Sequence, residues 1–208
     1  MPLQNRVTPF GELTISPARG LLMGNRGGRL HDAQRKLGAR RWASKQWICC
    51  KLDFNDRHRK VWGDSYSELF FLDEVTAFAA GHRPCFECRR KDAQAFAALF
   101  PGQHRAPEMD NVLHDERLDG RGKRLHRRGL DELPDGAMIA LDGAAFAVRG
   151  KKLLRWSPSS YDESRVRPRG LDADVLTPPS IVAVLAKGFA PLWHPSAGAG
   201  APIAGTLL

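Results

Sequence analysis

The sequence predicts an α+β protein: a zinc-centred β-hairpin/helix unit followed by a β-meander with a C-terminal helix. Three features carry this prediction: a Cys-x-x-Cys before a helical stretch, an alternating apolar run upstream, and an Asp-Gly turn between two apolar runs downstream. We expect a zinc-binding unit with a basic N-terminal segment over residues 1–102. Residues 103–208 would form a basic connection and a small β-rich unit, and the two parts are also compatible with one compact domain.

Residues 46–62 predict the β-hairpin of the first unit. Alternate residues of its first strand share one apolar face, namely Ile48, Cys50, Leu52 and Phe54. Asn55-Asp56 supplies turn residues, and residues 57–62 would return as the second strand. The glycine-rich stretch 23–29 ahead of the hairpin is expected to be a surface loop.

Two helices are expected around the cysteine motif, and a third near the end of the chain. The first covers 74–80, with Asp73 as its N-cap and Gly81 as its stop. The second runs from the motif to about residue 100. In the second half, strands 138–141, 144–148 and 152–156 form the meander, and Thr177 caps the last helix.

Composition narrows the class of protein. The chain has 208 residues, of which 42% are hydrophobic and 26% charged, which excludes an intrinsically disordered protein. It contains no apolar run long enough to span a membrane, and its start does not resemble a signal peptide. We therefore expect a soluble, cytoplasmic protein, and four cysteines are too few for a disulfide scaffold.

The four cysteines predict a zinc site. Cys85 and Cys88 follow Pro84 at a helix start, a spacing that lets two thiolates bind one ion. A redox motif is the alternative, but it usually follows a strand in a βαβ unit. Cys49 and Cys50 would supply a further ligand, and because neighbours on a strand face opposite ways we favour Cys50. The fourth ligand would be a carboxylate or a histidine, with His31, His58 and His82 within range.

The charge distribution predicts a polyanionic partner. The net charge is +9, and residues 19–60 carry twelve basic and three acidic residues. A second basic cluster covers residues 117–128. We expect nucleic acid, DNA before RNA, with a solvated basic face as the alternative. The candidate contacts are Arg26, Arg29, Arg40, Arg41, Arg124, Arg127 and Arg128.

Two other functions remain open on the sequence. Asp110, His114 and Glu116 group near the second basic cluster, and Asp110 and His114 share a face if the segment is helical. These three residues could serve as acid/base groups or metal ligands of a hydrolase or nuclease acting on nucleic acid. The alternative, which we favour, is an ordinary ion-paired helix face, because a His–Asp pair four residues apart is common on surface helices. The third hypothesis is a zinc-dependent module that binds an acidic protein.

One segment resembles a known family. Residues 70–90 read FFLDEVTAFAAGHRPCFECRR, and this run is similar to the zinc-binding domain of Ada-type DNA alkylation-repair proteins. The resemblance implies structural zinc held by cysteines, and in that family one cysteine accepts methyl groups from DNA phosphotriesters. Here the first two cysteines are adjacent rather than three residues apart, and His82 replaces an aromatic residue. The resemblance therefore implies zinc and a DNA-related role, but not methyl transfer.

Overall fold

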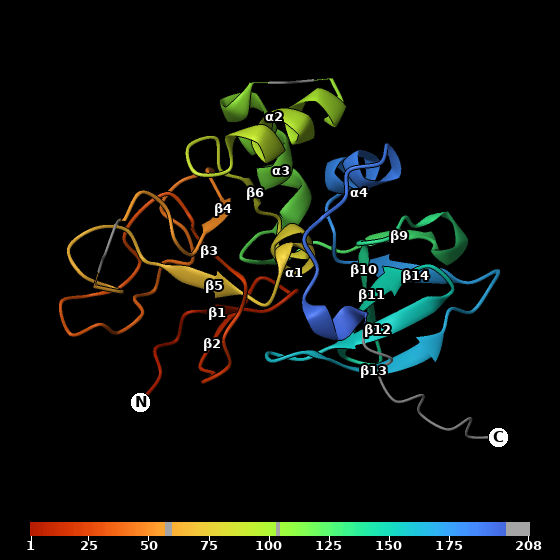
Figure 1. Cartoon of the computed structure of the whole chain (residues 1–208), viewed down its shortest axis with the longest axis horizontal. Helices are drawn as coiled ribbons and strands as arrows, with labels where there is room; N and C mark the ends of the chain where they lie inside the picture. Colours follow the sequence, from red (N-terminus) through yellow and green to blue (C-terminus); the bar gives the residue numbers. More distant parts are fainter. Residues whose placement is uncertain (57–59, 103–104, 199–208) are drawn as a thin grey trace.

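The computed structural model describes residues 1–56, 60–102 and 105–198 (Figure 1). Within them the chain forms two six-stranded sheets, a two-stranded sheet and four α-helices, so the predicted α+β class is confirmed. No helix among these residues has the length and apolar character needed to cross a lipid bilayer.

The first sheet has the strand order β2-β1-β5-β3-β4-β6. Its strands are β1 (Arg6–Val7), β2 (Leu13–Thr14), β3 (Leu22–Asn25), β4 (Ile48–Lys51), β5 (Leu69–Phe71) and β6 (Arg83–Pro84). The expected loop over 23–29 is wrong for its first three residues, because they belong to β3. A Cβ on Gly24 would lie 2.1 Å from the Ile48 carbonyl oxygen, so this glycine permits close strand packing rather than a flexible loop.

The predicted hairpin over 46–62 is also wrong in its pairing. Strand β4 is antiparallel to β3 and parallel to β6, instead of pairing with a returning segment. Residues 61–62 form a turn, and residues 57–59 lie outside the described part of the chain. Pairing between segments more than twenty residues apart has no local signal, whereas a turn sequence such as Asn55-Asp56 does.

The helices follow the expectations closely. Helix α1 (Glu74–Ala79) is capped by Asp73, whose carboxylate accepts the Thr76 amide at 2.9 Å, and Gly81 follows it with φ of +87°. The remaining helices are α2 (Arg90–Leu99), α3 (Ala106–Arg117) and α4 (Pro179–Ala186). Thr177 does not cap α4, because its hydroxyl accepts the Met138 amide at 2.9 Å and Pro178 holds the N-cap position.

The second sheet has the order β13-β12-β11-β10-β14-β9. Its strands are β9 (His126–Gly129), β10 (Met138–Leu141), β11 (Ala144–Arg149), β12 (Lys152–Trp156), β13 (Tyr161–Val166) and β14 (Asp172–Val175). Asp142 and Gly143 both have positive φ, at 52° and 74°, which confirms the tight turn between β10 and β11. The segment that was expected to be a basic connection contains α3 and a hairpin of β7 (Leu118–Asp119) and β8 (Gly122–Lys123). Two short 3₁₀ helices cover Leu130–Glu132, after β9, and Pro195–Ala197, after α4.

Helix α1 lies between the two sheets and joins their cores (Figure 1). One of its sides carries Val75 and Ala79, which belong to the same buried cluster as Met138 and Leu154 of the second sheet. Its other side carries Phe78, which belongs to a second cluster spanning α2, α3 and α4. The two parts of the sequence thus share apolar cores around one short helix.

Candidate metal centre and basic segments

Three of the four cysteines converge. The parallel pairing of β4 with β6 sets Cys49 opposite Pro84, and the Cys85 amide donates to the Cys49 carbonyl at 3.0 Å. This register brings the turn 85–89 beside the exposed end of β4. The Sγ atoms of Cys50, Cys85 and Cys88 all lie within 4.8 Å of one another. Thiolates around a tetrahedral zinc ion, with Zn–S near 2.3 Å, are about 3.8 Å apart. The cluster therefore could hold a metal ion.

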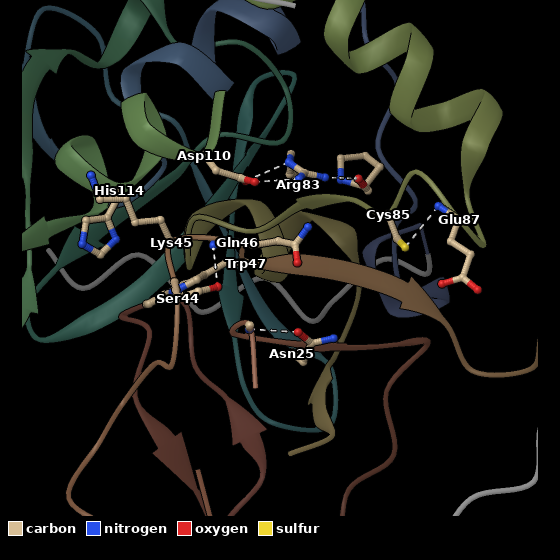
Figure 2. Close-up of polar contacts among 12 residues, drawn as sticks. Asn25, Ser44, Lys45, Gln46, Trp47, Arg83, Cys85, Glu87, Asp110 and His114 are labelled. Atoms are coloured by element: carbon tan, nitrogen blue, oxygen red, sulfur yellow. Dashed lines mark hydrogen bonds and ion pairs between the residues drawn. The ribbon is translucent and has the colours of Figure 1, made fainter. Parts of the chain in front are cut away.

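The electrostatics of the cluster favour a thiolate at its centre. Hydrogen bonds from the Cys50 and Cys88 thiols and from the Cys88 amide lower the pKa of Cys85. The Glu87 amide, which donates to the Cys85 sulfur at 3.4 Å, lowers it further (Figure 2). The same sulfur contacts, together with burial, raise the pKa of Cys50. Three thiols thus compete for ionisation, and a cation among them would let all three ionise.

None of the histidines suggested as a fourth ligand completes the set within the described residues. The His82 ring accepts a hydrogen bond from Arg26 Nε at 3.3 Å and packs between Trp47 and Phe71. Burial lowers the pKa of His82 well below its usual value. His31 contacts the Ser67 hydroxyl at 2.6 Å and the Gly63 carbonyl at 2.9 Å. His58 lies outside the described residues.

Cys49 does not join the cluster, because its side chain points to the opposite face of β4. It is fully buried, and its sulfur accepts a hydrogen bond from Arg89 Nη1 at 3.2 Å. The same guanidinium pairs with Glu74 at 2.6 Å, which ties β4 to α1 and to the start of α2. Burial and the Glu74 carboxylate raise the pKa of Cys49. Cys49 is a neutral core thiol, as the opposite-facing geometry of a strand requires.

A cavity of about 250 Å³ adjoins the three thiols. It is lined by the alternating residues that were expected to share a face: Ile48, Cys50, Leu52 and Phe54. This apolar face does not cover the core, because the buried side of the segment carries Trp47 and Cys49. Glu68 also lines this cavity, and its buried Oε1 has no hydrogen-bond partner in the described structure. Nothing in the local sequence around Glu68 signals this position.

The structure does not bring Asp110, His114 and Glu116 together as a catalytic or metal site. Both carboxylate oxygens of Asp110 accept from the Arg83 guanidinium, at 2.8 and 2.7 Å (Figure 2). Glu116 accepts from the amide and hydroxyl of Ser180, at 3.0 and 2.7 Å, and so holds the first turn of α4. The only metal-type group found among the described residues is the cysteine cluster. The segment is helical and forms part of α3, but the carboxylates of Asp110 and Glu116 bond side chains and backbone of neighbouring elements.

The seven candidate arginines divide by exposure. Arg26 is 1% exposed and donates to the Gly11 and Arg41 carbonyls, so it does not lie on the exposed surface, and its inclusion as a surface contact is wrong. The other six are exposed: Arg29, Arg40, Arg41, Arg124, Arg127 and Arg128. Arg127 pairs with Asp172 and Asp174, at 3.7 and 3.4 Å. Arg121, which was not singled out, donates to the Ala39 carbonyl at 2.8 Å.

Comparison of the chain with known protein families, curated proteins and solved structures finds no match. The local resemblance of residues 70–90 to the Ada-type zinc domain therefore stays a prediction. Two cysteines of that run, Cys85 and Cys88, do belong to the thiol cluster.

Proposed function

We propose that the protein is a zinc-stabilised nucleic-acid-binding protein, with DNA preferred over RNA. One observation carries the proposal: the two arginine-rich segments, separated by residues 61–116 in the sequence, meet in the fold. The Arg121 guanidinium bonds the Ala39 carbonyl, which places residues 117–128 against residues 19–60. Arg41 and Arg121 line one pocket from the two sides. Clustered exposed guanidinium groups suit the regularly spaced phosphates of a nucleic acid.

The donor set supports zinc as the metal. Three thiolates are soft ligands, which favour zinc over the hard cations calcium and magnesium. A fourth ligand would complete the tetrahedral geometry of a structural site. The resemblance of residues 70–90 to a DNA-repair zinc domain supports both the zinc and the preference for DNA.

The hydrolase alternative has less support. Asp110 and Glu116 already bond Arg83 and Ser180, and His114 Nδ1 accepts from Arg117 at 3.1 Å. Each of the three groups is thus engaged with a different neighbour. We therefore assign them structural roles.

The test is a salt titration of binding to fluorescein-labelled duplex DNA, single-stranded DNA and RNA, read by anisotropy. The double variant Arg40→Ala/Arg124→Ala should bind more weakly and show a shallower dependence on salt, by about 0.9 in log–log slope per lost duplex phosphate contact. Arg165→Ala is the matched control, because Arg165 is exposed on β13 and pairs with Glu163. If no nucleic acid binds at low salt, the proposal fails and a zinc-dependent protein-interaction module takes its place.

A further inference from the structure

A pocket of about 460 Å³ opens where the two basic segments meet. Residues from both segments line it, together with β2 and the loop before it. Its charged lining comprises Arg26, Arg41, Arg117, Arg121 and Lys123, with Glu12 as the only acidic residue among the described lining. The pocket therefore has a strong excess of positive charge.

Three of these cations are committed to neutral acceptors. Arg26 donates to the Gly11 and Arg41 carbonyls and to the His82 ring. Arg117 donates to the Gly81 and Lys45 carbonyls and to the His114 ring. Lys123 donates to the Ala79 carbonyl. No carboxylate in the described structure forms an ion pair with any of the three, although Arg26 and Arg117 are each only 1% exposed.

The two buried guanidinium groups are held in fixed positions by Trp47. Arg26 lies 3.8 Å and Arg117 4.1 Å from the centre of its ring, and the Trp47 indole N–H donates to the Ser44 carbonyl. The Arg117 side chain also packs closely against Gly81, where a Cβ would lie only 2.6 Å from the Arg117 Cδ. The cations are thus oriented before any ligand arrives, which lowers the entropy lost on binding.

Uncompensated buried charge is unfavourable, and the titration of these groups reflects it. Burial and the neighbouring guanidinium groups lower the pKa of Lys123 to about 7 and help lower that of Arg26. The Arg117 Nε also lacks a hydrogen-bond partner among the described residues. Buried charges in proteins are normally paired, and an anion in this pocket would pair all three.

We propose that this pocket binds the phosphate group of a nucleotide, either free or at the end of a nucleic-acid strand. Guanidinium forks and an ammonium group match the oxygens of a terminal phosphate. Trp42, half-buried at the same pocket, offers a ring on which a base could stack. The pocket volume is in the range of sites for ligands of nucleotide size. The strand-end form of the ligand rests on the proposed function, whereas binding of a free nucleotide does not.

The experiment compares four probes on the full-length zinc-loaded chain: inorganic phosphate, a 5′-mononucleotide, and one DNA oligonucleotide with either a 5′-phosphate or a 5′-hydroxyl. Thermal unfolding measures the first two at ionic strength matched with chloride, and anisotropy measures the oligonucleotides. We expect phosphate and the mononucleotide to raise Tm, and the 5′-phosphorylated strand to bind at least tenfold more tightly than the 5′-hydroxyl strand. The variant Lys123→Met should abolish most of both effects, while Lys152→Met should keep them, because Lys152 is an exposed residue at the start of β12.

The outcomes separate this inference from the proposed function. Equal binding of both oligonucleotides, with no rise in Tm from phosphate or the mononucleotide, overturns the pocket and leaves general nucleic-acid binding intact. A rise in Tm with the mononucleotide, lost in Lys123→Met, supports the pocket even if no oligonucleotide binds, and then the proposed function fails. If Lys123→Met does not fold, Arg117→Lys tests the same geometry, because it keeps the charge and removes the planar fork.

Discussion

At the scale of single residues, the two adjacent cysteines have opposite roles. Cys50→Ala should lose the bound metal, because only Cys50 of the pair lies within 4.8 Å of the Cys85 and Cys88 sulfurs. Cys49→Ala should keep it, while losing about 1–2 kcal/mol of stability from the broken hydrogen bond with Arg89. Metal content measured by mass spectrometry beside urea unfolding checks both variants. Metal retained by Cys50→Ala and lost by Cys49→Ala would contradict the register of β4.

Lys123 makes a prediction about pH. Its pKa is about 7 in the folded protein and near 10.4 when unfolded, so between these values the unfolded chain binds more protons. Stability should therefore rise with pH between 7 and 9, with a contribution below about 1.4 kcal/mol per pH unit. The lowering comes from burial, Arg117 and Arg26, and the pocket also carries Arg41, Arg121 and Glu12.

The measurement is urea unfolding at pH 7, 8 and 9 in buffers free of phosphate. Lys123→Met should flatten the rise, because it removes the group that titrates. A wild-type and a variant profile of equal slope would show that Lys123 does not titrate in this range.

Sequence alone predicts the residues whose partners are near in the chain, and fails for those whose partners are distant. The Cys85–Cys88 pair and the Asp73 cap depend on residues three positions apart, and both were identified. Arg26 was expected to be a surface cation, but its burial depends on Trp47 and His82, which lie just before β4 and β6 and are distant in the sequence. Residue type sets what a side chain can bind, while burial decides whether it faces solvent.

At the scale of elements, Arg83 and Asp110 join β6 to α3 through a buried bidentate ion pair. Asp110→Ala should destabilise the protein by about 3–5 kcal/mol, because it leaves the Arg83 charge buried without a partner. His114→Ala, on the same helix but half-buried, should cost less than about 1 kcal/mol. Urea unfolding of the two variants checks the contrast, and an Asp110→Ala protein as stable as the wild type would restore a functional role for this carboxylate.

The elements that the sequence predicted are those with local signals. The turn Asp142-Gly143 fixes β10 and β11, and Asp73 with Gly81 bounds α1. The order of the first sheet could not be predicted, since β4 pairs with β3 and β6 across long connections. The apolar periodicity of a strand does not indicate which distant strand it pairs with.

At the scale of the whole molecule, α1 connects the metal centre to the second sheet by polar contacts as well as by its core. Asp73 accepts hydrogen bonds from the Tyr161 hydroxyl at 2.9 Å and from the His194 amide at 3.0 Å. Glu74 accepts from the Leu192 amide and also holds Arg89, which lies one residue beyond Cys88. If the turn that carries the thiols became disordered, the ion pair between Arg89 and Glu74 would be lost. The resulting change in α1 would then disturb the second sheet, which packs against this helix.

Removal of the metal should consequently destabilise both halves together. Structural zinc contributes directly to folding, and the buried clusters around α1 connect elements from both parts of the chain. We expect a chelator to lower Tm and to speed hydrogen exchange of the β11 and β12 amides, although neither strand touches the cysteines. Adding back one equivalent of zinc should restore protection. If β11 and β12 keep native protection in metal-free protein while β4 loses it, the two parts of the chain are independent domains and α1 belongs energetically to the second.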